Sequence, residues 1–482
     1  MDIKSNIGEN LKVGWQTNEK NEHMKYYKNQ RCQFGLKLIL ITLFVSHVNL
    51  LLSKSINAAS ITFSDVNAAV QNAVSGDIVY VPAGISDWGT NMLSVPGGVY
   101  LKGAGKDQTK IKRSLSTTKY LIQFNGGVGS SLSDMTLEGC YNEDEVYTNG
   151  VRFYNGCVDF RVFNCLFKKF AFSAVNVGNS SLQRGVIHNN EFLDNFFASI
   201  GNYGYGVVVY GNGVWTELEL GTENAVFVED NYFSGNRHDI ASNNASKYVF
   251  RYNQIVATSP AKNFASTDAH GLSSSPRGSR SFEIYNNSYT ALYFTGLKRS
   301  AVGIRGGDGV IFNNTCTNRV SRTVELSLEG GSCGTYPVQD QIRSLYIWDN
   351  ESHDELGYTV GGIANNCPSS IMLNRDYFVI PKPDYSPYVY PHPLRTISDI
   401  ETISSDIFSD VLVSINKERN SISIACDNNI NQLEVFNLMG KLVYYNNQDI
   451  NSITIDMSHF MAGVYIVKCS IQGKIYTKKI IY

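Results

Sequence analysis

The sequence has little proline, no CxxC pair, almost no net charge and only one long hydrophobic run. Its 482 residues include 11 prolines, and 41 lysines and arginines stand against 43 aspartates and glutamates, a formal net charge of -2. This balance excludes a globally basic nucleic-acid binder, and we expect no nucleic-acid partner. Without a CxxC pair, neither a zinc ribbon nor a thioredoxin-like site is indicated.

The single hydrophobic run, Leu38–Leu52, has about 15 residues and is short for a membrane span of roughly 20. Basic residues precede it and small residues follow. This order predicts a Sec signal peptide cleaved near Ala58, so residues 1–58 form an N-terminal extension and leader. A single-pass anchor is the alternative, and Met24 is a second candidate start.

Nine cysteines in a chain of this length are too few for a disulfide scaffold. Cys32 lies in the predicted leader. Cys333 and Cys367 are candidates for one bridge, and the sequence leaves the pairing open.

The chain is rich in glycine (41), tyrosine (29) and phenylalanine (24), which favours an all-β fold with many turns. Residues 64–74 carry apolar residues at helical spacing, with Ser64 as a candidate N-cap. Thereafter a β-rich phrase ending in asparagine returns at irregular intervals, at Asn164, Asn190, Asn231, Asn253, Asn287, Asn314 and Asn350. Such repeats predict a β-solenoid with an asparagine at each corner, and a helix capping its first coil.

The phrases Gly76–Gly84 and Gly98–Gly105, followed by the asparagine-cornered strands, resemble the right-handed parallel β-helix of the pectate-lyase-like superfamily. The resemblance covers roughly residues 59–380, which we expect to form this domain. It implies the fold more strongly than the reaction, because the superfamily holds lyases, glycosidases and non-enzymes.

Residues 381–407 hold five closely spaced prolines and predict a stiff linker. Residues 408–482 then alternate short strands with turns, as in a small β-sandwich. The phrases Val435–Lys441, Ala462–Lys468 and Lys478–Ile481 resemble the C-terminal sorting domain of the type IX secretion system. The resemblance implies a Gram-negative bacterial protein that the secretion machinery releases or anchors at the surface. An ordinary binding module is the alternative.

Three successive coils carry an unusually polar strand, and we expect these strands to lie side by side on one face. They supply the predicted catalytic residues Arg237, His238, Asp268, His270 and Arg305. Between residues 231 and 310, nine lysines and arginines stand against four acidic residues, a local surplus that would attract a polyanion. The predicted substrate-binding residues are Tyr203, Tyr205, Tyr210, Trp215 and Arg277.

This set suits β-elimination of an acidic, uronate-containing polysaccharide. We expect His238 or His270 to act as the base, tuned by Asp268, while Arg237 and Arg305 hold carboxylates. A glycoside hydrolase using Asp239, Asp268 or Asp308 is the second reading, and a non-catalytic glycan-binding adhesin is the third. Calcium is left open, because the acidic run Glu143–Glu145 lies several coils away and is expected to be a solvated loop. We expect a monomer.

Overall fold

The computed structural model describes residues 53–395 and 411–481, with gaps at 116, 141–147, 179–183, 197–202, 260–261, 263–264, 274, 293–299, 319, 321, 354–361, 417–420, 438–440, 461–463 and 472–473. The chain divides into two compact units, residues 1–394 and 395–482. The predicted leader up to residue 52 and the acidic run Glu143–Glu145 lie outside the described residues. None of the described helices is long and apolar enough to cross a membrane.

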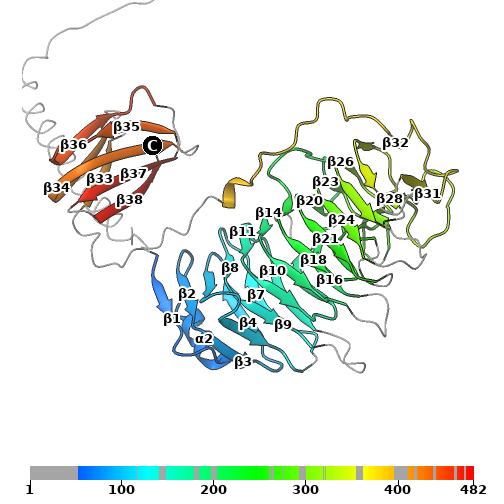
Figure 1. The fold of residues 1–482 in the computed structure, drawn as a ribbon, viewed down its shortest axis with the longest axis horizontal. Helices are drawn as coiled ribbons and strands as arrows, with labels where there is room; N and C mark the ends of the chain where they lie inside the picture. The colour runs from blue at the N-terminus through cyan, green and yellow to red at the C-terminus, as the bar shows by residue number, and fades with distance from the viewer. Residues whose placement is uncertain are drawn as a thin grey trace, which may run out of the picture. The chain divides into compact units, whose positions relative to one another are not determined.

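The first unit is a parallel β-helix, as the repeats predict (Figure 1). Each coil contributes one strand to each of three parallel sheets. Sheet 1 contains β1 (Ser55–Asn57), β2 (Ile78–Val81), β5 (Tyr100–Gly103), β8 (Ser131–Ser133), β11 (Val158–Phe163), β14 (Arg184–His188), β17 (Val226–Glu229), β20 (Lys247–Arg251), β23 (Ser281–Tyr285), β26 (Asp308–Phe312), β29 (Leu345–Trp348) and β32 (Tyr377–Phe378).

Sheet 2 contains β3 (Gly84–Asp87), β6 (Thr109–Lys112), β9 (Thr136–Glu138), β12 (Leu166–Lys168), β15 (Glu191–Leu193), β18 (Tyr232–Ser234), β21 (Gln254–Ala257), β24 (Ser288–Ala291), β27 (Thr315–Asn318) and β30 (Glu351–His353). Sheet 3 contains β4 (Leu93–Pro96), β7 (Tyr120–Asn125), β10 (Asn149–Tyr154), β13 (Ser173–Gly178), β16 (Tyr205–Tyr210), β19 (His238–Asn243), β22 (Thr267–Ala269), β25 (Ser300–Ile304), β28 (Arg322–Leu326) and β31 (Ile363–Asn365).

The first coil is capped by helix α2 (Phe63–Gln71), which buries Val66, Ala69 and Val70 against the core. Its N-cap position is Thr62, so Ser64 lies inside the helix and is not the cap. Strand β1 lies before the predicted cleavage position and pairs with β2, and Ala58 is buried. The helix therefore covers the apolar end that stacking leaves open, as predicted.

A ladder of asparagines runs along the coils at the corner between sheets 1 and 2. Each Nδ2 donates to the Oδ1 of the next copy at 2.9–3.1 Å, through Asn190, Asn231, Asn253, Asn287, Asn314 and Asn350. The position before each ladder residue takes the left-handed conformation, as at Asn189 and Asp230. Asn164 belongs to this second set, with φ of 52°, and Cys165 occupies the ladder position, which corrects the predicted register there.

Part of the proline-rich segment predicted as a linker packs against the β-helix. Its first part packs on sheet 1, where Tyr390 stacks on Tyr252 and the Tyr385 hydroxyl donates to Glu283 at 2.5 Å. We call residues 384–394 the strap. The prolines predict stiffness, but the tyrosines between them supply contacts that hold the segment on the first unit. Cys333 and Cys367 form a disulfide.

The second unit has its own core and one antiparallel sheet. Its strands are β33 (Val411–Asn416), β34 (Ser421–Asn437), β35 (Leu442–Asn446), β36 (Ile450–Asp456), β37 (Val464–Ile471) and β38 (Lys474–Ile481). Within the region expected to alternate short strands with turns, residues 421–437 form the single long strand β34, which pairs with β33, β35, β36 and β37.

Candidate functional site

The three polar strands lie next to one another on sheet 3, in the order β25, β22, β19. Asp268 on β22 is in register with Ala241 on β19 and Gly303 on β25. Ile240 and Ala269 point into the core, so their neighbours Ala241 and Asp268 face outward. The alternation therefore puts Asp268, His270 and Arg305 on the outer side of sheet 3, and Arg237 and His238 line the same cavity as Asp268.

Asp268 is the centre of this cluster and is buried. Its Oδ1 accepts from Arg305 Nε at 3.1 Å and its Oδ2 accepts from Arg305 Nη2 at 2.6 Å, a bidentate pair. Burial disfavours the carboxylate, but the charges of Arg305 and His270 outweigh it and hold the pKa of Asp268 well below its ordinary range. Asp268 is thus a fixed negative charge.

His270 lies between two carboxylates. Its Nε2 is 3.1 Å from Asp268 Oδ2, and its Nδ1 is 3.3 Å from Glu329 Oε2. Burial opposes the charged ring, but Asp268 and Glu329 outweigh burial and raise the pKa of His270 to about 9. The two carboxylates therefore favour the imidazolium form of His270 against the positive charge of Arg305, whose Nη2 lies 2.8 Å from Nε2.

His238 has the opposite environment, because burial excludes its charged form and lowers its pKa to about 3. Its ring stacks on Tyr205 with centroids 5.6 Å apart, and its Nδ1 lies 2.7 Å from the carbonyl oxygen of Ala265. Its Nε2 is 3.6 Å from Asp268 Oδ2 and has no hydrogen-bond partner among the described residues. The distance to Asp268 is therefore a contact between a carboxylate and a neutral ring.

A cavity of about 140 Å³ opens beside these groups and is lined by Arg237, His238, Ala265, Asp268, Gly303, Arg305, Glu325 and Ser327. Gly303 stands in register with Asp268 and contributes no side chain. A Cβ atom there would lie 2.9 Å from the Cβ of Ala265, so the glycine permits a close approach of the backbone.

Sequence reasoning missed the next strand, β28, and the turn that follows it. Glu329 accepts from Arg305 Nη1 at 2.8 Å, and Glu325 lines the cavity. Glu329 follows Arg305 by 24 residues, which is one coil of this solenoid. The coil period was the only signal that could have found it, because nothing else distinguishes this glutamate from a surface residue.

The predicted role of Arg305 changes as a result. Both ends of its guanidinium are held by carboxylates of the protein, Asp268 and Glu329. Arg305 therefore orders the cluster. Arg237 remains a cavity-lining cation, and its Nη1 donates to the Tyr205 hydroxyl at 3.4 Å.

The aromatic residues predicted to bind substrate do not form one surface beside the cavity. Tyr205 is buried under His238, and Tyr203 and Tyr210 are half-buried beside it. Trp215 lies outside the cavity lining, and its ring contacts the guanidinium groups of Arg277 and Arg280 at 3.9 and 4.8 Å. Arg277 is held by Asp340 in a bidentate pair. These two arginines anchor the Trp215 loop.

Several cations of the local positive surplus are neutralised in the folded structure. Acidic residues from outside the 231–310 window pair with its cations: Glu219 with Lys247, Glu229 with Arg251, Asp194 with Lys262, and Asp340 with Arg277. A count along the sequence misses these partners because the solenoid brings distant segments together.

The carboxylates of the cluster do not fit a calcium site. Calcium takes six to eight oxygen ligands, whereas the oxygens of Asp268 and Glu329 here face Arg305 and His270. No group of three or more metal-binding side chains with suitable geometry occurs among the described residues.

The other two carboxylates predicted for a glycoside hydrolase lie apart from the cavity lining. Asp239 is buried beneath the cluster, where it accepts from Ser266 and Asn236, and Asp308 lies on sheet 1.

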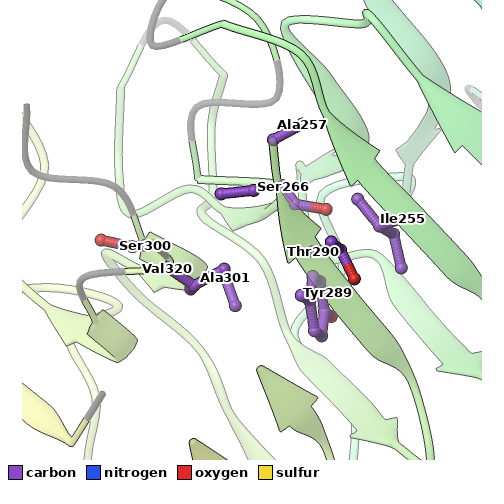
Figure 2. Close-up of a pocket in the computed structure, with 9 residues that line it drawn as sticks. Ile255, Ala257, Ser266, Tyr289, Thr290, Ser300, Ala301 and Val320 are labelled. Atoms are coloured by element: carbon purple, nitrogen blue, oxygen red, sulfur yellow. The ribbon is translucent and has the colours of Figure 1, made fainter. Parts of the chain in front are cut away.

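A second, smaller cavity of about 10 Å³ lies between sheets 2 and 3 (Figure 2). Apolar and hydroxyl side chains line it, among them Tyr289, Ile255 and Ser266. Its volume admits at most a water molecule, so it is a packing defect and not a ligand site.

Residues 388–482 match the secretion system C-terminal sorting domain. The chain therefore combines a parallel β-helix with a sorting domain that indicates type IX secretion, and it is secreted or displayed at the cell surface.

Among solved structures, the chain is similar to ORF18 of Geobacillus virus E2, at 12% identity over 88% of this chain and 76% of that one, with a TM-score of 0.43. It is also similar to the Dettilon tailspike protein (9% identity, 86% and 80%, TM-score 0.45) and to pectin methylesterase from carrot (13%, 68% and 88%, TM-score 0.36). No curated protein matches the chain.

Proposed function

We propose that the protein is an exported polysaccharide lyase that cleaves a uronate-containing glycan by β-elimination. The observation that carries the proposal is the pair His238 and His270, two histidines around one carboxylate with opposite charge states. Environments that push the pKa values of two neighbouring groups apart are typical of acid and base partners in catalysis. The sorting domain adds that such an enzyme would meet its substrate outside the cell.

His238 is the proposed base. A carbonyl oxygen only accepts hydrogen bonds, so the contact with Ala265 places the hydrogen on Nδ1 and leaves the lone pair on Nε2. In the proposed step this lone pair takes the proton from C5 of the uronate. The C–H electrons form the C4–C5 double bond, and the C4–O bond breaks. The substrate carboxylate adds a negative charge near the ring and raises the pKa of His238 toward that of a working base.

His270 is the proposed acid. Its side chain is 22% exposed and contacts Asp268, which lines the cavity; in the proposed step it gives its proton to the leaving oxygen. Arg237, in the cavity lining, is placed to bind the substrate carboxylate, which must be neutralised before its neighbouring proton can leave. Arg305 and Glu329 act as positioning residues.

Glycoside hydrolysis has less support in this cavity. An acid-base pair of carboxyl groups needs one member held protonated. Asp268 is held ionised, and the pKa of Glu325 is lowered because hydrogen bonds from Ser300 and Asn366 and the charge of Arg322 outweigh its burial. Neither carboxyl group therefore suits the role of general acid.

The test is the ultraviolet absorbance of the unsaturated uronate when the full chain acts on pectate, alginate, glucuronan and glycosaminoglycans, with and without EDTA. We expect absorbance to rise on one of them and EDTA to leave the rate unchanged. Reducing ends without a rise in absorbance would overturn the proposal in favour of a hydrolase. Retention on a glycan without any cleavage would favour a binding protein.

A further inference from the structure

An arginine far from the cavity, Arg152, faces outward on sheet 3 in the same register line as the carboxylate of Asp268. Arg152 on β10 is in register with Asn176, which pairs with Val208, then Ala241, then Asp268. Four strand spacings of about 4.8 Å separate the two residues, roughly 19 Å in all. The same outer face therefore carries two charged positions at a fixed separation.

Arg152 differs from Arg305, Arg277 and Arg280, which all form ion pairs with carboxylates. The guanidinium lies 3.9 Å from the ring centroid of Tyr154 and 5.2 Å from that of Tyr120. Its Nε is buried without a hydrogen-bond partner, and among the described residues no carboxylate forms an ion pair with it. A half-buried guanidinium whose Nε donor is unmet favours an anion supplied by a ligand.

The surroundings of Arg152 suit a sugar. Tyr154 is in register with Gly178, which places no side chain on the surface. A Cβ atom at Gly178 would lie 3.4 Å from the Cβ of Tyr210 and 3.1 Å from Asn176 Oδ1. The glycine therefore lets Tyr154, Tyr210 and the amide of Asn176 lie close together on the outer face of the sheet. Aromatic rings with a polar end bind the apolar faces of sugars while the hydroxyl groups make hydrogen bonds.

We propose that Arg152, with Tyr120, Tyr154 and Tyr210, binds a carboxylate of the same acidic polysaccharide that reacts beside Asp268. This inference rests on the proposed function and adds a distant subsite to it. A sugar unit in an extended chain spans about one strand spacing, so the subsite would hold a unit about four places from the cleaved bond. The geometry then favours long chains over short oligosaccharides.

The experiment compares Arg152→Ala and Arg152→Lys with the wild-type full chain on uronate oligosaccharides of increasing length and on the polymer. For Arg152→Ala we expect KM to rise about tenfold, but only for substrates long enough to reach both sites, with kcat on short substrates unchanged. Arg152→Lys should recover part of the loss. Arg161→Ala is the matched control, because Arg161 also contacts two rings, Tyr100 and Phe163, but on sheet 1.

Equal effects at every length, or no effect at the longest, would overturn the subsite while leaving the lyase proposal intact. A wild-type protein that neither cleaves nor binds any uronate polymer would instead overturn the proposed function. Binding is read separately from activity by the retardation of His238→Ala, with and without Arg152→Ala, in gels that contain the polymer. Thermal unfolding midpoints show whether Arg152→Ala remains folded.

Discussion

His238 donates its Nδ1 hydrogen to the carbonyl oxygen of Ala265 across 2.7 Å, and this one contact decides which nitrogen of the ring is basic. Ala265 comes two residues before β22, the strand that supplies Asp268. A backbone atom thus orients the ring of the proposed base, while the next strand supplies the charge of Asp268. Preorganised groups of this kind are the main source of electrostatic catalysis.

The first prediction concerns the base. His238→Ala should lower kcat by roughly 100-fold to 10,000-fold, the usual contribution of general base catalysis, and leave KM within a few-fold. Initial rates of unsaturated product on the polymer measure both quantities. His188→Ala is the control, because His188 stacks on Phe163 on sheet 1, away from the cavity. An active His238→Ala variant would exclude the assigned base.

The second prediction is a pH profile. His270 must carry a proton, so kcat/KM should fall as pH rises through about 9. Glu329→Gln removes one of the two carboxylates that raise this pKa, and the alkaline limb should move to lower pH. A limb that stays in place in Glu329→Gln would show that His270 does not control it.

The raised pKa of His270 also predicts how the free energy of unfolding depends on pH. The pKa of folded His270 lies above its ordinary value of 6.5, so the stabilisation it provides is complete below pH 6.5 and disappears as pH rises through 9. The difference in the free energy of unfolding between the wild type and His270→Gln should therefore shrink between these pH values. Urea titrations at several pH values measure it, and a constant difference would contradict the assignment.

Another prediction concerns Asn253, in the middle of the asparagine ladder. Asn253→Ala removes its side-chain bonds to Asn287 Oδ1 and the Val228 carbonyl, and leaves the backbone N–H of Asn231 without its acceptor. Each unsatisfied buried group costs about 1–3 kcal/mol, so we expect a loss of roughly 3 kcal/mol or more in the free energy of unfolding. Urea unfolding measures this loss.

Asn164→Gly is the matched control for the ladder. Asn164 is exposed and takes the left-handed conformation that glycine adopts readily, and within the described part of the chain its side chain donates only to Asp134, at 3.3 Å. Its loss should cost less than about 1 kcal/mol. Equal costs at Asn164 and Asn253 would mean that the ladder does not stabilise the coils.

The last prediction concerns the strap. Arg251 is fully buried, pairs with Glu229, and donates to the carbonyl oxygens of Tyr388 and Val389 at 2.7 and 2.9 Å. Arg251→Met leaves Glu229 as an uncompensated buried charge and should cost about 3–5 kcal/mol. It should also expose residues 384–394 to limited proteolysis. Arg184→Ala, which breaks a surface pair with Asp159, should cost at most about 1 kcal/mol.

The sequence predicts the solenoid well because its signal is repetitive. Seven asparagine-cornered phrases indicated the coils, and six of those asparagines form the ladder. Asn164 was placed one residue out of register, because an asparagine can occupy either the ladder position or the left-handed position before it. Local sequence does not distinguish the two.

The site was predictable only in part. The spacing of His238, Asp268 and Arg305 was enough to place them on neighbouring strands, because one coil separates each from the next. The pairing of Arg305 with Glu329, and the loss of the positive surplus to Glu219 and Asp340, depend on loops whose paths the sequence does not reveal. Charge counted along a chain is a poor guide to the charge of a folded surface when segments far apart in sequence meet.

The asparagine ladder also makes this scaffold adjustable in length. Each step joins only two adjacent copies, such as Asn231 and Asn253, through the same amide contact. Excising or grafting the segment between two copies would renew the contact with the next asparagine in line and leave the remaining steps in register. A protein engineer could therefore lengthen or shorten the outer face of the β-helix one coil at a time.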